Sequence, residues 1–144
     1  MRCFVCHTNW PERGAGDARL EQLMHIKNCA VIWEYSPRSG QNVAWLSEMD
    51  RVNIGDLIFM FANARSGHRG IIAVGKARRR RQGPITRNQL RPRPDWEGTE
   101  WIVNVKWTEL SWDLTNSCPF TAKNASFYEC DPEQAAVVRR HFKV

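Results

Sequence analysis

Arginine is concentrated in one part of this 144-residue chain. Between Asp56 and Asp95 the sequence contains ten basic residues and no acidic one, and four of the ten are consecutive, Arg78 to Arg81. Arginine outnumbers lysine by 16 to 5, and its planar guanidinium group can bind a phosphate through two hydrogen bonds. Such a one-sided basic field is typical of proteins that bind nucleic acid or an anionic membrane surface. A solvated basic loop is the alternative that charge alone leaves open.

Tryptophan is also abundant, with seven residues in the chain. Trp101 and Trp107 alternate with polar residues in a segment of strand type, so we expect both in the core. Trp33 and Trp96 differ because each lies beside a loop, where two indole rings can hold a planar, electron-poor group between them. A nucleic-acid base flipped out of its stack is such a group. The alternative is that both rings only fill the ends of the fold.

Three N-terminal residues, Cys3, Cys6 and His7, match the C-x-x-C-H pattern of haem attachment, and the two cysteines match half of a zinc site or a redox pair. We expect none of these. The segment is of strand type, in which side chains three positions apart point to opposite faces, and no second C-x-x-C follows. The five cysteines are therefore expected to be reduced and buried, with no metal and no other cofactor bound.

The sequence contains no arrangement of residues that is typical of an enzyme. The four histidines are scattered along the chain. The acidic pairs are expected on the exposed surface, and they are Glu97 with Glu100 and Asp131 with Glu133. We therefore expect a protein without enzymatic activity. An enzyme that acts on small nucleotides or amides stays open as a third class, with Glu34 or Asp95 as its general base.

The elements that must position these residues follow from periodicity and turn signals. Strands are expected at 4–8, 29–33, 57–61, 70–77 and 100–110, and helices at 18–27, 42–50 and from Asp131 onward. Residues 57–61 are apolar at every position, which indicates a central strand buried on both faces. Asp131 and Pro132 are typical N-cap and first-turn residues. Residues 82–98 are rich in Pro and Arg and are expected to form a long loop.

The order of these elements indicates an α+β fold rather than a doubly wound α/β fold. A small, closed or nearly closed barrel with helices at its sides would protect the strand edges. The length is that of one domain, which we assign to residues 1–144. No apolar run approaches the roughly 20 residues of a membrane-spanning helix, and the N-terminal residues show no secretory or transit signal. A cytoplasmic location and no membrane partner are therefore expected.

Several short motifs together resemble the YTH and EVE domains of the PUA-like superfamily. They follow the order and spacing of those domains over residues 3–120, and they are Ala30-Val-Ile-Trp33, Gly55-Asp56-Leu-Ile-Phe-Met-Phe61, Ser66-Gly67-His68-Arg69-Gly70-Ile, Asp95-Trp96-Glu-Gly98 and Val105-Lys106-Trp107. The Gly-Asp pair before the central strand is more similar to EVE domains. The resemblance implies an α+β, PUA-like small mixed β-barrel of about five to six strands flanked by helices, which flips a modified base into an aromatic cage.

The resemblance also implies roles for individual residues. Trp33 and Trp96 match cage tryptophans, and Thr8 and Asn9 match the polar pair that faces the base edge. The candidate base pocket consists of Trp33, Trp96, Thr8, Asn9, Tyr35, Ser36 and Trp45. Glu34 and Tyr35 fall where YTH domains have small Ser or Thr residues, which leaves the identity of the base open. The candidate phosphate-binding residues are Lys76, Arg78, Arg79, Arg80, Arg81, Arg69, His68 and Arg91.

These observations predict a non-enzymatic nucleic-acid-binding domain that recognises a modified base, namely methylated or hydroxymethylated cytosine or methyladenine. DNA is favoured over RNA as the partner, with the domain as the targeting module of a restriction-type system, fused to or associated with a nuclease. The alternative is an RNA-binding PUA-like module, either a YTH-like methyladenine reader or a module independent of modification. In the latter case the basic residues bind the RNA and the tryptophans belong to the core.

Overall fold

The computed structural model describes residues 1–8, 20–34, 40–62, 70–85, 99–108, 117–123 and 125–144. Its elements follow the chain as β1 (Cys3–His7), α1 (Leu20–Lys27), β2 (Cys29–Glu34), α2 (Gly40–Asp50), β3 (Leu57–Ala62), β4 (Gly70–Ala77), β5 (Gln82–Ile85), β6 (Thr99–Trp107), β7 (Phe127–Glu129) and α3 (Pro132–Phe142). Each strand and helix that the sequence predicts is present. Among the helices that the structure describes, none is long and apolar enough to span a membrane.

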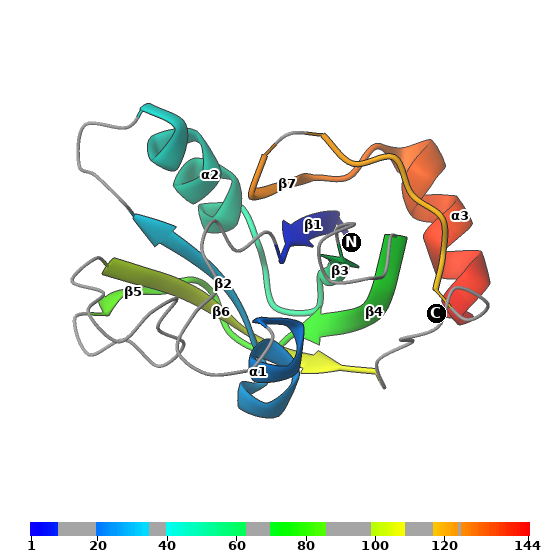
Figure 1. Ribbon diagram of the computed structural model, residues 1–144, viewed down its shortest axis with the longest axis horizontal. Helices are drawn as coiled ribbons and strands as arrows, with labels where there is room; N and C mark the ends of the chain where they lie inside the picture. Colours follow the sequence, from blue (N-terminus) through cyan, green and yellow to red (C-terminus); the bar gives the residue numbers. More distant parts are fainter. Residues whose placement is uncertain (9–19, 35–39, 63–69, 86–98, 109–116, 124) are drawn as a thin grey trace.

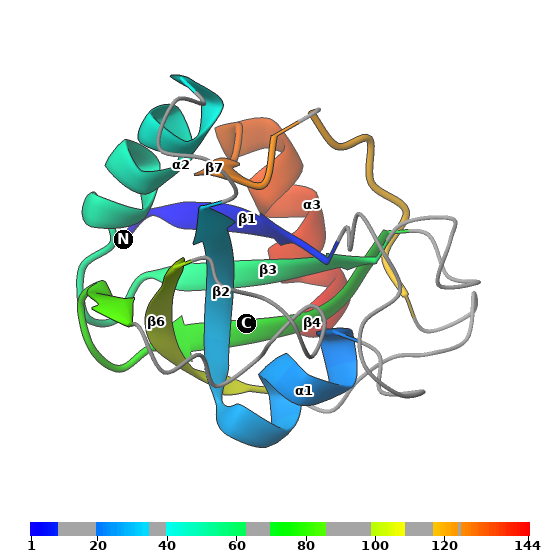
Figure 2. The same cartoon turned by 60° about the vertical axis from the view of Figure 1, so that its left-hand side comes forward.

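The strands form a mixed, curled sheet that makes a half-barrel (Figures 1 and 2). Their order is β2-β6-β4-β3-β1-β7, and β5 pairs with β6 beside this path. The pair β1 and β3 is parallel, and the other pairs are antiparallel. Helix α2 contacts both β2 and β7, the two ends of the strand order. This arrangement confirms the expected α+β fold with helices at the sides of a small mixed barrel.

Side chains of β1 and β3 alternate between two hydrophobic clusters on opposite faces of the sheet. Phe4 and Cys6 belong to one cluster, which also contains residues from α2. Cys3 and Val5 belong to the other, which includes Val138 of α3. Every residue of β3 is buried, so the prediction of a central strand covered on both faces is confirmed. Alternation also places Cys3 and Cys6 on opposite faces, as the spacing of three residues predicts.

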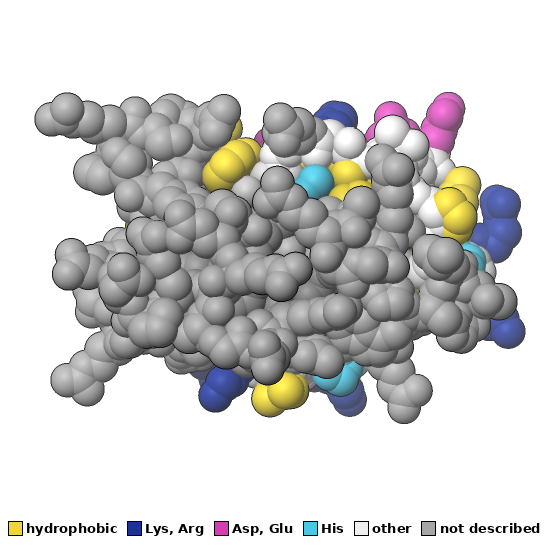
Figure 3. All heavy atoms as spheres, viewed as in Figure 1, with side chains coloured by type: hydrophobic (Ala, Val, Ile, Leu, Met, Phe, Trp, Pro, Cys, Tyr) yellow, Lys and Arg dark blue, Asp and Glu magenta, His cyan; other side chains and the backbone are white. Residues whose placement is uncertain are grey.

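The beginning of α3 is set by its local sequence. The Asp131 side chain accepts a hydrogen bond of 2.8 Å from the backbone N–H of Glu133, and Pro132 occupies the first helical turn. Basic side chains lie in the last turn, where they interact favourably with the helix dipole. Figure 3 shows acidic side chains near the start of this helix and Lys or Arg side chains farther along it. The predicted N-cap is therefore confirmed.

Two short strands lie where the sequence predicts none. Strand β5 occupies the start of the segment predicted as a long loop, and it pairs within the described residues only with β6. A strand at such an edge tolerates Pro84, which has no N–H to donate. Strand β7 is three residues long and pairs with β1. Such short strands depend on their partners, because a few residues show little periodicity of their own.

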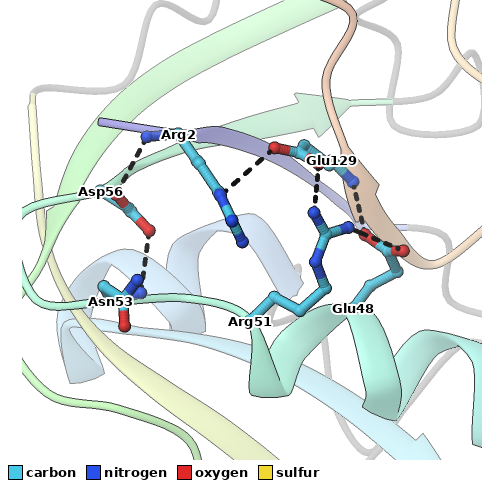
Figure 4. Close-up of polar contacts among 6 residues, drawn as sticks. All are labelled: Arg2, Glu48, Arg51, Asn53, Asp56 and Glu129. Carbon is cyan, nitrogen blue, oxygen red and sulfur yellow. Dashed lines mark hydrogen bonds and ion pairs between the residues drawn. The ribbon is translucent and has the colours of Figure 1, made fainter.

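A network of charged groups joins the end of α2 to β1 and β7 (Figure 4). The Arg51 guanidinium contacts the carboxylate of Glu129 at 2.8 Å and that of Glu48 at 3.2 Å. The Glu129 backbone N–H donates to the Glu48 carboxylate at 3.1 Å. Directly before β3, the Asp56 carboxylate accepts a hydrogen bond of 3.0 Å from the Arg2 backbone N–H. These contacts position α2 against the β1–β7 edge of the half-barrel.

Candidate nucleic-acid interface

The four consecutive arginines lie in a bulge between β4 and β5. Ala77, the last residue of β4, pairs with Val105, while Gln82, the first residue of β5, pairs with Ile102. Residues 78–81 therefore lie opposite only two residues of β6, and the additional chain must project from the ladder. We call Arg78–Arg81 the arginine bulge.

The arginines of this bulge do not all have the same environment. Arg78–Arg80 are exposed, and none of them forms an ion pair with a residue in the described ranges. Arg81 instead pairs with the Asp50 carboxylate at the end of α2 and donates to the Gly83 carbonyl at 3.0 Å. Its guanidinium carbon lies 4.9 Å from the centre of the Trp101 ring. Arg81 thus fastens the bulge to the fold, and Asp50 compensates its charge.

Lys106 extends the basic surface, although the sequence interpretation did not include it among the phosphate-binding residues. It lies on β6 directly opposite Lys76 of β4, and both side chains are exposed. Directly opposed residues of an antiparallel pair project from the same face of the sheet. The alternation of β6 provides the signal that could have found Lys106, because it assigns this residue to the polar face of the strand. Nothing in the sequence of either strand indicates that Lys106 pairs with Lys76, because the register depends on the tertiary structure.

At its other end, β6 holds a buried acid. Glu100 pairs with Trp33 of β2 on one side and with Ile85 of β5 on the other, and its side chain is 0% exposed. The expectation that Glu100 lies on the exposed surface is therefore wrong. The physical reason is that β6 is an inner strand here, with a neighbour on each edge. Charge and sequence spacing do not reveal such a position.

Two members of the candidate base pocket have described side chains. Thr8 is buried, and its hydroxyl donates to the Phe61 carbonyl at 2.8 Å. The Thr8 hydroxyl proton is thus committed to the backbone of β3. Trp45 on α2 is partly buried and packs against the core cluster. Trp107 is buried as predicted, with its indole N–H donating to the Cys29 carbonyl at 3.1 Å, whereas Trp101 is only partly buried.

The remaining candidate site residues lie outside what the structure describes. For Trp33 the structure describes the backbone at the end of β2 but not the indole ring. The others lie wholly outside the described residues, and they are Asn9, Tyr35, Ser36, Trp96, His68, Arg69 and Arg91. The structure thus brings together Lys76 on β4 and the arginine bulge that follows β4, and both lie beside β6. It leaves the predicted cage as a sequence-based expectation.

All five cysteines are buried and unpaired by disulfides. Burial raises the pKa of Cys6, Cys29 and Cys130 to about 12 and also raises the pKa of Cys3 and Cys118. At neutral pH these thiols are protonated, so they are poor nucleophiles and poor metal ligands. Within the described residues, no three His, Cys, Asp or Glu side chains are grouped as metal ligands would be.

Comparisons with known proteins show a likeness in fold. No family model matches the chain, and no curated protein matches it. Three solved structures are similar: a protein from Pseudomonas putida (TM-score 0.50, 14% identity, 96% of this chain and 98% of that chain), a hypothetical protein from Leishmania major (0.48, 11%, 99% and 96%), and a protein from Pseudomonas syringae (0.46, 12%, 96% and 99%). At such identity the Pseudomonas putida likeness shows the fold alone, which is a mixed α+β half-barrel with few helices.

Proposed function

We propose that this chain is a non-enzymatic nucleic-acid-binding domain that flips a modified base into an aromatic cage. The base is a methylated or hydroxymethylated cytosine, or methyladenine, and the favoured partner is DNA. In this proposal the domain directs a restriction-type nuclease, fused or associated, to modified sites. Trp33 and Trp96 form the cage walls, and the exposed residues Arg78–Arg80 contact the phosphates together with Lys76.

The observation that carries the proposal is the exposure of Arg78–Arg80. Three adjacent guanidinium groups repel one another, and no carboxylate of a described residue forms an ion pair with them. A phosphate backbone supplies the missing negative charge, and it matches the fork geometry of arginine.

The position of the bulge also supports a base pocket nearby. The Arg78 backbone N–H donates to the carbonyl of Asn104 at 2.7 Å, which lies four residues from Glu100 on β6. Trp33 pairs with Glu100, so one strand connects the phosphate-binding residues to the cage tryptophan. A flipped nucleotide stays attached to its backbone, so a reader must bind both within a short distance.

The test is a binding titration with oligonucleotides that each carry one modified base, together with unmodified controls. Wild-type protein should prefer one modified oligonucleotide. Trp33→Ala should remove about 1–3 kcal/mol of stacking, a loss of roughly 5- to 150-fold in affinity, and should abolish the preference. Arg79→Glu with Arg80→Glu should weaken binding to all sequences and reduce the dependence of affinity on salt.

Arg140→Glu provides the matched control, because it makes the same charge change at an exposed position on α3. It should retain more affinity and more salt dependence than a single Arg79→Glu variant. If the two substitutions had equal effects, the arginine bulge would contribute only through the net charge of the protein and would not be a specific phosphate-binding site. If the Trp33→Ala variant still preferred the modified base as strongly as wild type, Trp33 would not be a wall of the cage.

Two observations favour an RNA-binding module without base recognition as the second candidate. The Thr8 hydroxyl donates to a backbone carbonyl, and Trp45 packs against the core, so both side chains have structural roles. In this case the affinity for unmodified RNA should equal that for methyladenine RNA and exceed that for DNA. Trp33→Ala should then leave RNA affinity unchanged in protein that remains folded.

A further inference from the structure

Two ammonium groups face solvent side by side on the β4–β6 ladder. Lys76 and Lys106 are direct partners in the antiparallel register, and both side chains are exposed. Like charges at directly opposed positions destabilise a sheet. Among the described residues, no carboxylate forms an ion pair with either lysine. An anion between the two lysines would therefore relieve their repulsion and form a contact with both strands.

The lysine pair and the predicted base pocket lie at opposite ends of β6. Lys106 lies six positions after Glu100 on β6, and Glu100 pairs with Trp33. At about 3.3 Å per residue, this separation is about 20 Å along the strand. The arginine bulge lies between the two points, because it projects opposite residues 103 and 104 of β6. Basic groups therefore continue from the lysine pair toward the pocket.

Arg81 is not part of this exposed series. Its guanidinium group pairs with Asp50 and lies over the Trp101 ring, so binding a phosphate would require it to leave both. The groups free to meet a backbone are those of Lys76, Lys106 and Arg78–Arg80, which we call the phosphate track.

We propose that one nucleic-acid strand lies along the phosphate track and that one of its phosphates is held between Lys76 and Lys106. This inference rests on the proposed function, because it takes the Trp33 end of β6 as the site of the recognised base. With about 3.4 Å per nucleotide in a stacked strand, 20 Å corresponds to about six nucleotides. The domain thus requires a flank of about six nucleotides on one side of that base, and Lys106 contacts the far end of the flank.

The experiment measures how the effect of Lys106→Gln depends on the length of the oligonucleotide. Each single strand carries the preferred modified base with two or eight nucleotides on its 5′ side or on its 3′ side. Lys106→Gln should reduce affinity for the long flank on one side only, and the slope of log affinity against log salt should fall by about 0.7. It should have no effect on either short flank. Lys143→Gln, an exposed lysine change after α3, should behave as wild type.

Equal losses on short and long flanks, or no loss on any, would overturn the phosphate track. A separate arm uses unmodified strands of eight or more nucleotides, which measures backbone binding alone. If the protein shows no preference for a modified base but Lys106→Gln still lowers the salt slope on unmodified strands, the base-reading proposal fails and the phosphate seat between the two lysines stands. Thermal melts of each variant establish that lost affinity does not reflect unfolding.

Discussion

Acid should destabilise this protein through one histidine at the end of β1. The His7 ring lies 4.8 Å from the ring of Phe61 and 6.1 Å from that of Tyr128, centre to centre. Burial lowers the pKa of His7 from 6.5 to about 4, and a hydrogen bond with the Lys123 backbone opposes this shift. The Nε2 atom is buried, and no described residue forms a hydrogen bond with it. The folded protein therefore keeps His7 neutral at pH 7.

The sign and size of the effect follow from proton linkage. Between pH 6.5 and 4 the unfolded chain binds a proton at His7 and the folded chain does not, so the free energy of unfolding falls as pH falls. The full shift corresponds to about 3.4 kcal/mol. Solvent reaches part of the ring, which reduces the expected loss to about 2 kcal/mol. This contribution is fully present above pH 6.5.

The assay compares wild type with His7→Phe by urea denaturation at several pH values from 7 to 4. Carboxylates titrate in the same range in both proteins, so the difference between the two curves isolates His7. The wild-type free energy of unfolding should fall by about 2 kcal/mol more than that of the variant. Parallel curves would refute the conclusion that burial holds this ring neutral.

Three further substitutions test the packing and the helix cap. Gly75→Ala places a Cβ against the side chains of Val105 and Trp107, and it should cost about 1–3 kcal/mol of stability by overpacking; an unchanged melting temperature would contradict this close approach. Trp107→Ala should cost about 3–5 kcal/mol, measured by urea denaturation, and a cost below 1 kcal/mol would argue against its core position. Asp131→Ala should cost about 1 kcal/mol by removing the bond to the Glu133 N–H, whereas Asp131→Asn should retain most of that stability.

Local signals allowed much of the fold to be predicted. Strand 70–77 has the predicted limits, and α3 begins at the predicted cap. These succeed because the information lies within a few neighbouring residues: alternation of side chains, apolar runs and the chemistry of Asp and Pro at a helix start. The concentration of arginine is likewise visible in the composition, and the exposure of Arg78–Arg80 agrees with it.

The features that the sequence did not predict depend on pairing between distant segments. Strand β7 has only three residues, and its strand conformation depends on pairing with β1, which lies more than a hundred residues earlier in the chain. Glu100 is buried because β2 and β5 flank it, although its charge alone predicts exposure. Alternation correctly predicts that Trp101 packs against the core, but it does not predict that the ring is only partly buried and lies beside the Arg81 guanidinium.

In the candidate interface, too, some features follow from the sequence and others only from the tertiary structure. The sequence by itself determined that a basic surface exists and that it includes the residues around Arg79. Only the tertiary structure decided which charges that surface presents, because Asp50 neutralises Arg81 from 31 residues away and the β4–β6 register brings Lys106 beside Lys76. The net charge available at a surface depends on which groups meet in space, and the chain order of two strands does not specify their register.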